Sequence, residues 1–212
     1  MRCSRRRETP PLFQALSSGA ADLVSLGPGE IVMRVFQLVG TADPGQFVAF
    51  WSARYKYDNE YLYDQNIGQS HSVNRVWRLF EWKNGTINIA ARKRQSVETV
   101  YLPQLASLPT LRTHAEGRTY VGGLAGGAIW NIFWLHCLNR GLFPIFDQHT
   151  YRAMASIEGL TVREIPSTRE DKTAIYFDQY IPFLARRFPN QAERDLDKAL
   201  FTYGRFLKSG YA

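Results

Sequence analysis

The sequence contains very few of the residues that hold metal ions and clusters. Its 212 residues include two cysteines and four histidines. Two cysteines as distant as Cys3 and Cys137 exclude a disulfide framework, and they are too few for a four-cysteine iron–sulfur cluster within one chain. The histidines show no zinc-ligand spacing with these cysteines or with one another. We therefore expect neither a metal ion nor another cofactor.

Long apolar runs are absent as well. No run approaches the roughly 18 residues of a membrane-spanning helix, and no apolar segment typical of a secretory signal follows the basic start of the chain. The sequence also shows no internal repeat, no low-complexity tract and no Walker loop. We therefore expect no membrane partner and a cytoplasmic location.

Apolar and basic residues, by contrast, are plentiful. Hydrophobic residues make up 45% of the chain, which predicts a globular core, and aromatic residues make up 14%, enough to offer surfaces on which bases could stack. The net charge is +7. This balance favours a polyanionic partner, with nucleic acid as the first candidate. Composition alone leaves open the alternative of a basic protein that binds no polyanion.

The start of the chain differs in composition from the rest. Residues 1–28 hold an arginine run and a Pro-Pro pair, which predict a flexible basic arm with one short helix near residues 12–16. Its arginines could touch phosphates or simply be solvated. Residues 29–212 predict a single, mostly α-helical domain. Within it, residues 30–39 fit a strand or a short helix. The alternating residues 86–90 fit either a small β element before residue 100 or a segment that simply leads into the basic run at residues 92–94.

Helical periodicity is clearest just after Ser72. Apolar residues there recur at the spacing of one helix face: Val73, Val76, Trp77 and Phe80. Either Ser70 or Ser72 can cap the start of this helix, and Asn84-Gly85 can end it. Further helices are predicted over three segments, residues 46–57, 168–187 and 191–207.

The most informative segment is residues 120–154. Four glycines within six positions supply positive-φ geometry and room for a close backbone approach: Gly122, Gly123, Gly126 and Gly127. Residues 128–138 are apolar on nearly every face, which predicts a central, buried helix. After Phe143-Pro-Ile-Phe, Asp147 can cap a helix that runs to about residue 157, where its charge suits the positive helix end.

This order of glycine hairpin, buried helix and aspartate resembles the helix-hairpin-helix DNA glycosylase superfamily, and within it the oxoguanine-DNA-glycosylase-like (OGG-fold) proteins of bacteria. The match rests on Gly123, Gly126 and Gly127 in the hairpin, and on Pro144, Ile145, Asp147 and His149 in the aspartate segment. The resemblance covers residues 120–154, a small part of the chain. It implies a mostly α, helix-hairpin-helix glycosylase-like domain that binds DNA.

The resemblance also implies roles for individual residues. Asp147 would be the catalytic carboxylate beside the anomeric carbon of a nucleotide flipped out of DNA. Nucleic-acid contacts would come from Gly123, Gly126, Gly127, Gln148, His149 and Arg152. Plainer roles are available for the same residues: Asp147 as a helix cap alone, His149 as a packing residue, and the glycines as a tight turn.

One departure from the family bears directly on the chemistry. Bifunctional members carry a Schiff-base lysine at the start of the buried helix, and here that position falls at residues 127–129, none of which is lysine. The resemblance thus implies a monofunctional N-glycosylase, a hydrolase without lyase activity. A relocated nucleophile is one alternative, drawn from Lys83, Lys93 and Lys172. The other is an OGG-fold binding module without chemistry, such as an accessory protein that meets a protein partner in a bacterial antiviral defence system.

Overall fold

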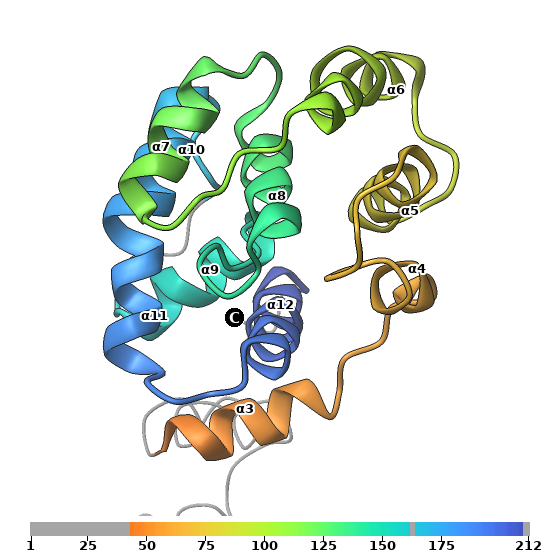
Figure 1. The fold of residues 1–212 in the computed structure, drawn as a ribbon. Coiled ribbons are helices and arrows are strands. Elements are labelled where there is room, and N and C mark those ends of the chain that lie inside the picture. The colour runs from red at the N-terminus through yellow and green to blue at the C-terminus, as the bar shows by residue number, and fades with distance from the viewer. Residues whose placement is uncertain (1–42, 162–163, 210–212) are drawn as a thin grey trace, which may run out of the picture.

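The computed structural model describes residues 43–161 and 164–209, which fold into helices joined by loops (Figure 1). The elements are, in order, α3 (Pro44–Ser52), α4 (Glu60–Asp64), α5 (Val73–Asn84), α6 (Ala91–Ser96), the π-helical η1 (Val97–Tyr101), the 3₁₀-helical η2 (Leu102–Ala106), α7 (His114–Gly123), α8 (Ala128–Leu138), α9 (Gln148–Ile157), α10 (Arg169–Ala174), the π-helical η3 (Ile175–Tyr180), α11 (Ile181–Arg187) and α12 (Glu193–Lys208). The prediction of a mostly α-helical protein is confirmed. The predicted basic arm and the segments at 12–16 and 30–39 lie outside the described residues.

Helix ends follow the capping residues that the sequence supplies. Ser72 begins α5, where its hydroxyl accepts a hydrogen bond from the Arg75 amide at 3.4 Å. Gly85 ends the same helix with a φ of 82°, a left-handed conformation that glycine adopts without strain. Thr113 begins α7 in a capping box with Glu116. The helix predicted over residues 73–84 therefore forms with the expected bounds.

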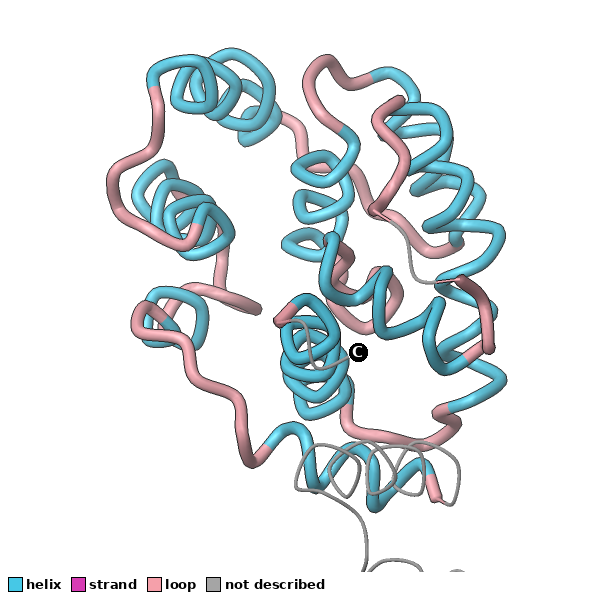
Figure 2. The backbone as a smooth tube through the Cα atoms, turned by 180° about the vertical axis from the view of Figure 1, so that it is seen from behind, coloured by secondary structure: helices cyan, strands magenta, loops and turns pink. Residues whose placement is uncertain are grey.

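The β element predicted before residue 100 does not form. Figure 2 shows only helices and loops in the described part of the chain, and residues 86–90 are a loop. In this loop the Thr86 hydroxyl accepts a hydrogen bond from the Asn88 amide at 2.9 Å, and the Asn84 amide group donates to the Thr86 carbonyl at 3.1 Å. These side chains satisfy the backbone locally, so the segment needs no partner strand.

One predicted helix is wrong in extent. α3 begins directly after Asp43, which caps it, and ends at Ser52 rather than near residue 57.

The helix predicted over residues 168–187 forms over almost that range, capped by Thr168, but as the three contiguous elements α10, η3 and α11. Its π-helical stretch comes just before Pro182, which lacks the N–H that a regular helical ladder would use.

The predicted glycine hairpin is the connection between α7 and α8. Gly122 and Gly123 are the last residues of α7, whereas Gly126 has a φ of 91° and lies in the left-handed region. Gly127 is the N-cap of α8 and has no side chain that could cap it. The hairpin is therefore a short loop over residues 124–127, and only Gly126 of these glycines uses positive-φ geometry.

α8 is buried because it lies between two hydrophobic cores. One core joins α3, α9, α11 and α12, and it receives Ile132 and Leu135 from α8. The other core joins α4, α5 and η1, and it receives Phe133 and Trp134. Figure 1 shows α8 standing between α4–α6 on one side and α7, α10 and α11 on the other. The predicted central helix is thus confirmed, and the two cores explain why it is apolar on nearly every face.

None of the helices within residues 43–161 and 164–209 combines the length and the hydrophobicity needed to cross a bilayer. α8 is apolar but short, and its apolar faces are used in packing against protein. α12 is longer, but it carries acidic residues in its first turn and basic residues in its last.

α9 packs tightly against α12, and this contact depends on Gly204. A Cβ atom added at residue 204 would lie 1.9 Å from the backbone oxygen of His149 and 2.5 Å from its carbonyl carbon. Backbone atoms cannot move away as a flexible side chain can, so only glycine permits this approach. Because His149 is two residues from Asp147, the crossing of α9 and α12 also sets the position of the aspartate.

We predict that Gly204→Ala lowers the free energy of unfolding by more than the about 1–3 kcal/mol typical of overpacking, because the new methyl group meets backbone. Gly122→Ala is the matched control, since no heavy atom lies within 4 Å of its added Cβ. That substitution should be neutral or should stabilise α7 by up to about 1 kcal/mol. Urea unfolding of the two variants measures both effects, and equal stabilities would contradict the close crossing.

Candidate active site

Asp147 stands at the start of α9, where the sequence places it. Its Oδ1 accepts hydrogen bonds from the amides of His149 at 2.8 Å and Thr150 at 3.1 Å. The amide of Asp147 donates in turn to the Thr150 hydroxyl at 2.9 Å, which completes a capping box. One carboxylate oxygen is therefore committed to the helix, and the second, Oδ2, is available for another partner.

The segment that leads to Asp147 is held by His136 of α8. Its Nδ1 lies 2.8 Å from the carbonyl oxygen of Phe143, which can only accept, so Nδ1 carries the proton. Nε2 then accepts a hydrogen bond from the Tyr63 hydroxyl at 2.7 Å. Burial lowers the pKa of His136 to about 3, so the ring stays neutral near pH 7 and keeps both bonds. This chain of hydrogen bonds joins α4, α8 and the approach to Asp147.

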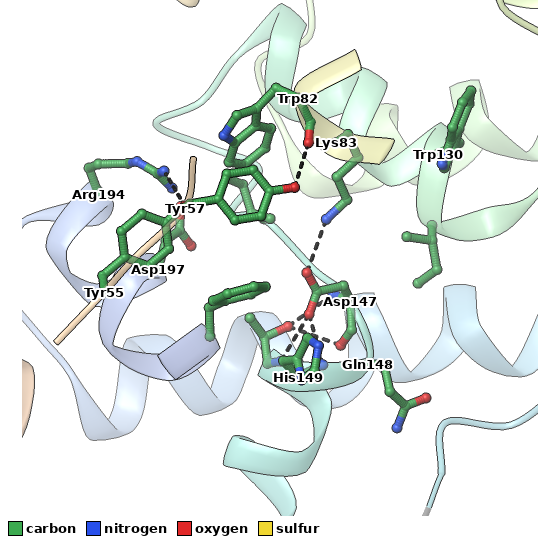
Figure 3. Close-up of a pocket in the computed structure, with 14 residues that line it drawn as sticks. Tyr55, Tyr57, Trp82, Lys83, Trp130, Asp147, Gln148, His149, Arg194 and Asp197 are labelled. Atoms are coloured by element: carbon green, nitrogen blue, oxygen red, sulfur yellow. Dashed lines mark hydrogen bonds and ion pairs between the residues drawn. The ribbon is translucent and has the colours of Figure 1, made fainter. Parts of the chain in front are cut away.

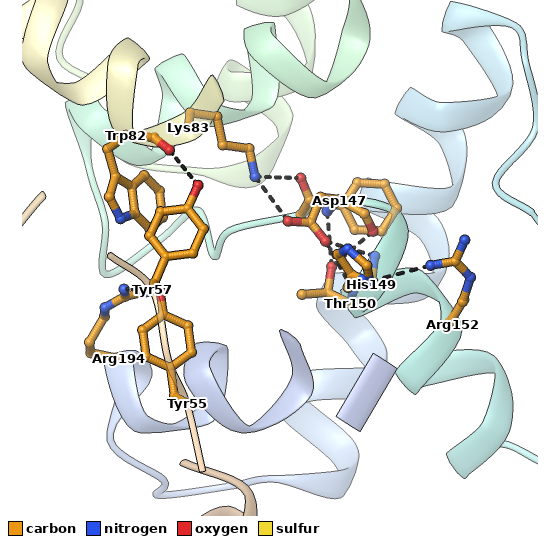
Figure 4. Close-up of polar contacts among 10 residues, drawn as sticks. Tyr55, Tyr57, Trp82, Lys83, Asp147, His149, Thr150, Arg152 and Arg194 are labelled. Carbon is orange, nitrogen blue, oxygen red and sulfur yellow. Dashed lines mark hydrogen bonds and ion pairs between the residues drawn. The ribbon is translucent and has the colours of Figure 1, made fainter. Parts of the chain in front are cut away.

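Lys83, in the last turn of α5, reaches across to Asp147. Its Nζ lies 3.2 Å from Oδ2 of Asp147 and 3.4 Å from the carbonyl oxygen of Phe146 (Figure 4). Only 6% of the Lys83 side chain and 19% of the Asp147 side chain are exposed. Burying an ammonium group without a partner is strongly unfavourable. The carboxylate and the carbonyl are therefore what allow a lysine at this interior position.

The surroundings of Asp147 favour its ionised form. Burial pushes the pKa of Asp147 upward, but the charge of Lys83, the neighbouring His149 and the helix N–H groups outweigh burial. The pKa of Asp147 therefore lies below its ordinary value. At neutral pH this residue is a carboxylate with one oxygen on the helix and the other on Lys83.

Lys83 and Asp147 face a cavity of about 310 Å³ between the α5 side of the molecule and α9 and α12 (Figure 3). We call it the aromatic cavity, because five of its lining residues are Tyr55, Tyr57, Trp82, Trp130 and Phe201. Its volume falls at the lower end of the range for small-molecule sites, about 300–1,000 Å³. Aromatic walls with a few charged groups suit a flat ligand that also carries polar atoms.

Polar contacts hold the aromatic wall in place. The Tyr57 hydroxyl donates to the carbonyl oxygen of Trp82 at 2.6 Å. Glu60 accepts from the Tyr55 hydroxyl at 2.8 Å and from the Trp82 indole N–H at 3.0 Å. Arg194 of α12 forms an ion pair with Glu60 and also lies over the ring of Trp82. The cavity is therefore formed before any ligand binds.

A second carboxyl group, Asp197 of α12, also lines the aromatic cavity. It is 6% exposed. Burial raises the pKa of Asp197 to about 7, with the positive charges of Arg194 and Lys83 opposing the rise and the charge of Asp147 adding to it. One cavity thus holds a carboxylate that is ionised and a carboxyl that retains its proton up to near neutral pH.

Several predicted nucleic-acid contacts lie at or beside this cavity. Gln148 and His149 line it together with Asp147. The hairpin glycines are exposed and lead directly into Ile129 and Trp130, which form part of the cavity wall. The structure therefore brings the first turn of α8, which follows the hairpin, to the same cavity as the aspartate segment, while the hairpin glycines themselves do not line it.

The side chain of Arg152 is buried, whereas an arginine that contacts DNA would be exposed. The Arg152 side chain is 4% exposed, forms an ion pair with Glu164 and donates to Nδ1 of His149 at 3.3 Å. The guanidinium thus orients the His149 ring, which also packs edge-on against Phe201 with ring centroids 4.9 Å apart. Burial is the main cause that lowers the pKa of His149, so this ring is neutral near pH 7.

Of the three lysines considered as relocated nucleophiles, Lys83 is the one that lines the aromatic cavity. Lys93 is exposed and donates to the Asn84 side chain at 2.9 Å. Lys172 donates to the backbone carbonyl of Ser167 at 2.7 Å, beside the start of α10. Burial and the contact with Asp147 thus separate Lys83 from the other two.

Sequence reasoning missed most of the cavity. Trp82, which is also part of a hydrophobic core, and Trp130 both line the aromatic cavity, and no motif marked Tyr55, Phe201 or Asp197. The fold brings these residues together from positions that are far apart in the sequence.

The described residues contain no group of three or more histidine, cysteine, aspartate or glutamate side chains placed to hold a metal ion. Comparison of the chain with protein-family models, with curated proteins and with solved structures gives no match. The function is therefore inferred from the residues of the aromatic cavity.

Lys83→Met should destabilise the protein, because it leaves Asp147 buried without its cation. Removing one partner of a buried ion pair typically costs about 3–5 kcal/mol, and the helix N–H groups that remain on Asp147 favour the lower end. The pKa of Asp147 should rise. The stability lost should be largest above the ordinary aspartate pKa and should shrink as falling pH protonates Asp147, which then needs no partner.

Urea unfolding between pH 3 and pH 7 measures this difference, and carboxyl NMR titration measures the pKa of Asp147. Lys93→Met, at an exposed lysine, is the matched control and should change neither quantity. An unshifted Asp147 titration in Lys83→Met would show that the ion pair does not form in solution.

Proposed function

We propose that this protein is a DNA N-glycosylase-like enzyme, which takes a flipped nucleotide into the aromatic cavity and breaks the bond between its base and C1′. The observation that supports this most is the Lys83–Asp147 pair facing that cavity. A carboxylate can stabilise the oxocarbenium-like charge that develops on the sugar. The aromatic walls can stack on the extruded base, and extrusion is required because a stacked base is out of reach.

Lys83 supplies a nucleophile at the same place. Nζ is an ammonium group in its pair with Asp147 and must first lose a proton; it would then form a bond to C1′ while the C1′–N bond breaks and its electron pair passes to the base nitrogen, which takes up a proton. Asp147 would accept the proton that Nζ releases, since the two groups are 3.2 Å apart. As the sugar ring opens, Asp147 passes its proton to O4′ and takes up a second proton from Nζ, which leaves a protonated imine between C1′ and Lys83 that water can hydrolyse.

Lys83 thus takes the role of the relocated nucleophile, whereas the resemblance alone implied a monofunctional N-glycosylase without lyase activity. Residues 127–129 at the start of α8 contain no lysine. α5 brings an amine to Asp147 from another part of the chain. The nucleophilic lysine has to lie within reach of C1′ and beside a carboxylate. It can therefore come from a different helix than the one that carries the lysine in the family.

The surface beside the cavity fits a DNA backbone. The hairpin is exposed, and α8 begins at Gly127 without a side-chain cap, which leaves backbone N–H groups free for a phosphate oxygen. The net charge of +7 favours approach to a polyanion. A phosphate held at the hairpin would place a neighbouring nucleotide next to Ile129 and Trp130 in the cavity wall.

We predict that borohydride traps a covalent complex between the wild-type protein and a duplex containing an abasic site, because reduction makes the imine with Lys83 permanent. Lys83→Gln should abolish the trapped complex, and Lys93→Gln, the matched control, should leave it intact. Denaturing electrophoresis measures the adduct, and peptide mapping locates the modified lysine. A complex that persists in Lys83→Gln would assign the chemistry to another amine.

Asp147→Asn should lower base excision by roughly a hundredfold to a thousandfold, the usual cost of losing one preorganised electrostatic group. Asparagine can still accept from the helix N–H groups, so α9 should form. Stability should fall by more than a cap change alone, because Lys83 loses its counter-ion. Duplex binding should survive. Activity is measured on duplexes that each carry one oxidised, deaminated or alkylated base, and undiminished excision would show that Asp147 is structural.

A wild-type protein that binds DNA but neither excises a base nor forms the trapped complex would favour the binding module without chemistry. In that case we would look for a protein partner, such as a component of an antiviral defence complex.

A further inference from the structure

Asp197 is an unusual buried carboxyl group. It is 6% exposed, and it forms no hydrogen bond or ion pair with any residue of the described ranges. Most buried polar side chains have such a partner. Its place on the wall of the aromatic cavity and of a second, polar cavity leaves its oxygens open to a bound ligand or to water as a partner.

The two carboxyl groups of the cavity come from different elements and different surroundings. Asp147 belongs to the start of α9 and already binds Lys83, whereas Asp197 lies one turn after Arg194 in α12. Figure 3 shows Asp197 on the side of Arg194 and Tyr55, and Asp147 on the side of His149. A nucleotide between them would meet an ionised carboxylate and a second, unpaired carboxyl at the same time.

Charged and titratable groups face Asp197 from several elements, among them Tyr63 of α4 and both Tyr176 and Tyr180 of η3. Arg194 and Lys83 lower its pKa, while Asp147 and Glu193 raise it together with burial, which is the largest influence. Asp197 also borders two further cavities, whose other titratable residues are Tyr63, Asp64, His114, His136 and Arg140. The balance leaves its pKa at about 7, the value at which a general acid works best near neutral pH.

We propose that Asp197 is the general acid of this cavity, which donates its proton to a ring nitrogen of the departing base. The proposal rests on the N-glycosylase function argued above. As the C1′–N bond breaks, its electron pair moves onto the base, and the base gains the Asp197 proton. C1′ gains its new bond to Nζ of Lys83, whose proton passes to Asp147. The substrate class is therefore a modified base that leaves poorly unless a ring nitrogen is protonated.

The second cavity gives Asp197 a way to recover its proton. This polar space of about 540 Å³ is lined by Asp64, Arg140 and Glu193 as well as Asp197. Water in such a space can exchange protons with the carboxyl group without crossing the aromatic cavity, where the base is bound. A single carboxyl can thus act once in every turnover.

The test compares two reactions of the same full-length protein. A duplex with a modified base needs a proton on the leaving group, whereas an abasic duplex has no base to release. Asp197→Asn keeps the size of the side chain but has no acidic proton. We expect base excision to fall at least about a hundredfold, while borohydride trapping on the abasic duplex stays within about twofold of wild type. Asp197→Glu should restore part of the excision.

The pH profile gives a second readout. Wild-type excision should decline as pH rises through about 7, because the deprotonated form of Asp197 has no proton to give. Asp197→Asn should lack that decline, and trapping on the abasic duplex should lack it in both proteins. The free energy of unfolding is an independent check on Asp197→Asn. Above pH 7 this variant should be at least as stable as wild type, because an ionised Asp197 is unfavourable in its buried position.

Each outcome is decisive. Undiminished excision by Asp197→Asn overturns the proposal, and so does equal loss of excision and trapping, which would make Asp197 structural. Trapping by wild type without excision of any base in the panel also overturns it, while preserving the role of Lys83. Absence of both reactions in wild type overturns the proposed N-glycosylase function, and the acid role with it.

Discussion

The ion pair of Lys83 and Asp147 is the interaction on which this site depends. It connects the end of α5, which packs in one hydrophobic core, with the start of α9, which packs in the other. Neither charge would be stable at its position alone, because both side chains are largely withdrawn from water. The pair therefore links the two sides of the molecule beside the aromatic cavity, at a point where apolar packing could not specify a single geometry.

α8 supplies the rigid part of the same arrangement. Its apolar faces are held between the two cores, and its one buried histidine, His136, fixes both Tyr63 of α4 and the Phe143 carbonyl before Asp147. Because the ring is neutral, these bonds do not depend on a proton being gained or lost near pH 7. A site mounted on packed helices in this way is positioned more precisely than one carried by free loops.

The parts of this arrangement that local rules govern could be predicted from the sequence. The apolar run 128–138 became the buried α8, and Asp147 became the cap of α9 because an aspartate before a helix satisfies its first N–H groups. The segment 86–90 shows the limit, since alternation predicted a strand while Thr86 and Asn84 closed a loop. Alternation describes one segment, whereas a strand requires a partner from elsewhere in the chain.

The functional pairings depended on tertiary structure. Lys83 stood out only weakly among the 26 lysines and arginines of the chain, because nothing in the order of residues shows that the end of α5 meets the start of α9. No sequence motif marks Asp197, because what distinguishes it is the lack of a hydrogen-bond or ion-pair partner among the described residues. Such properties arise when helices pack and cannot be assigned from spacing along one helix.

The charges around the cavity explain why Asp147 and Asp197 have different pKa values. Glu60 is matched by Arg194, with Lys198 3.6 Å away, and Asp147 is matched by Lys83. Asp197 is a further carboxyl without a cation of its own, so its ionisation would leave an unmatched negative charge in a poorly solvated place. Retaining a proton removes that cost. The same reasoning favours a ligand whose inserted part is neutral and accepts hydrogen bonds, with any phosphate groups left outside at the exposed hairpin.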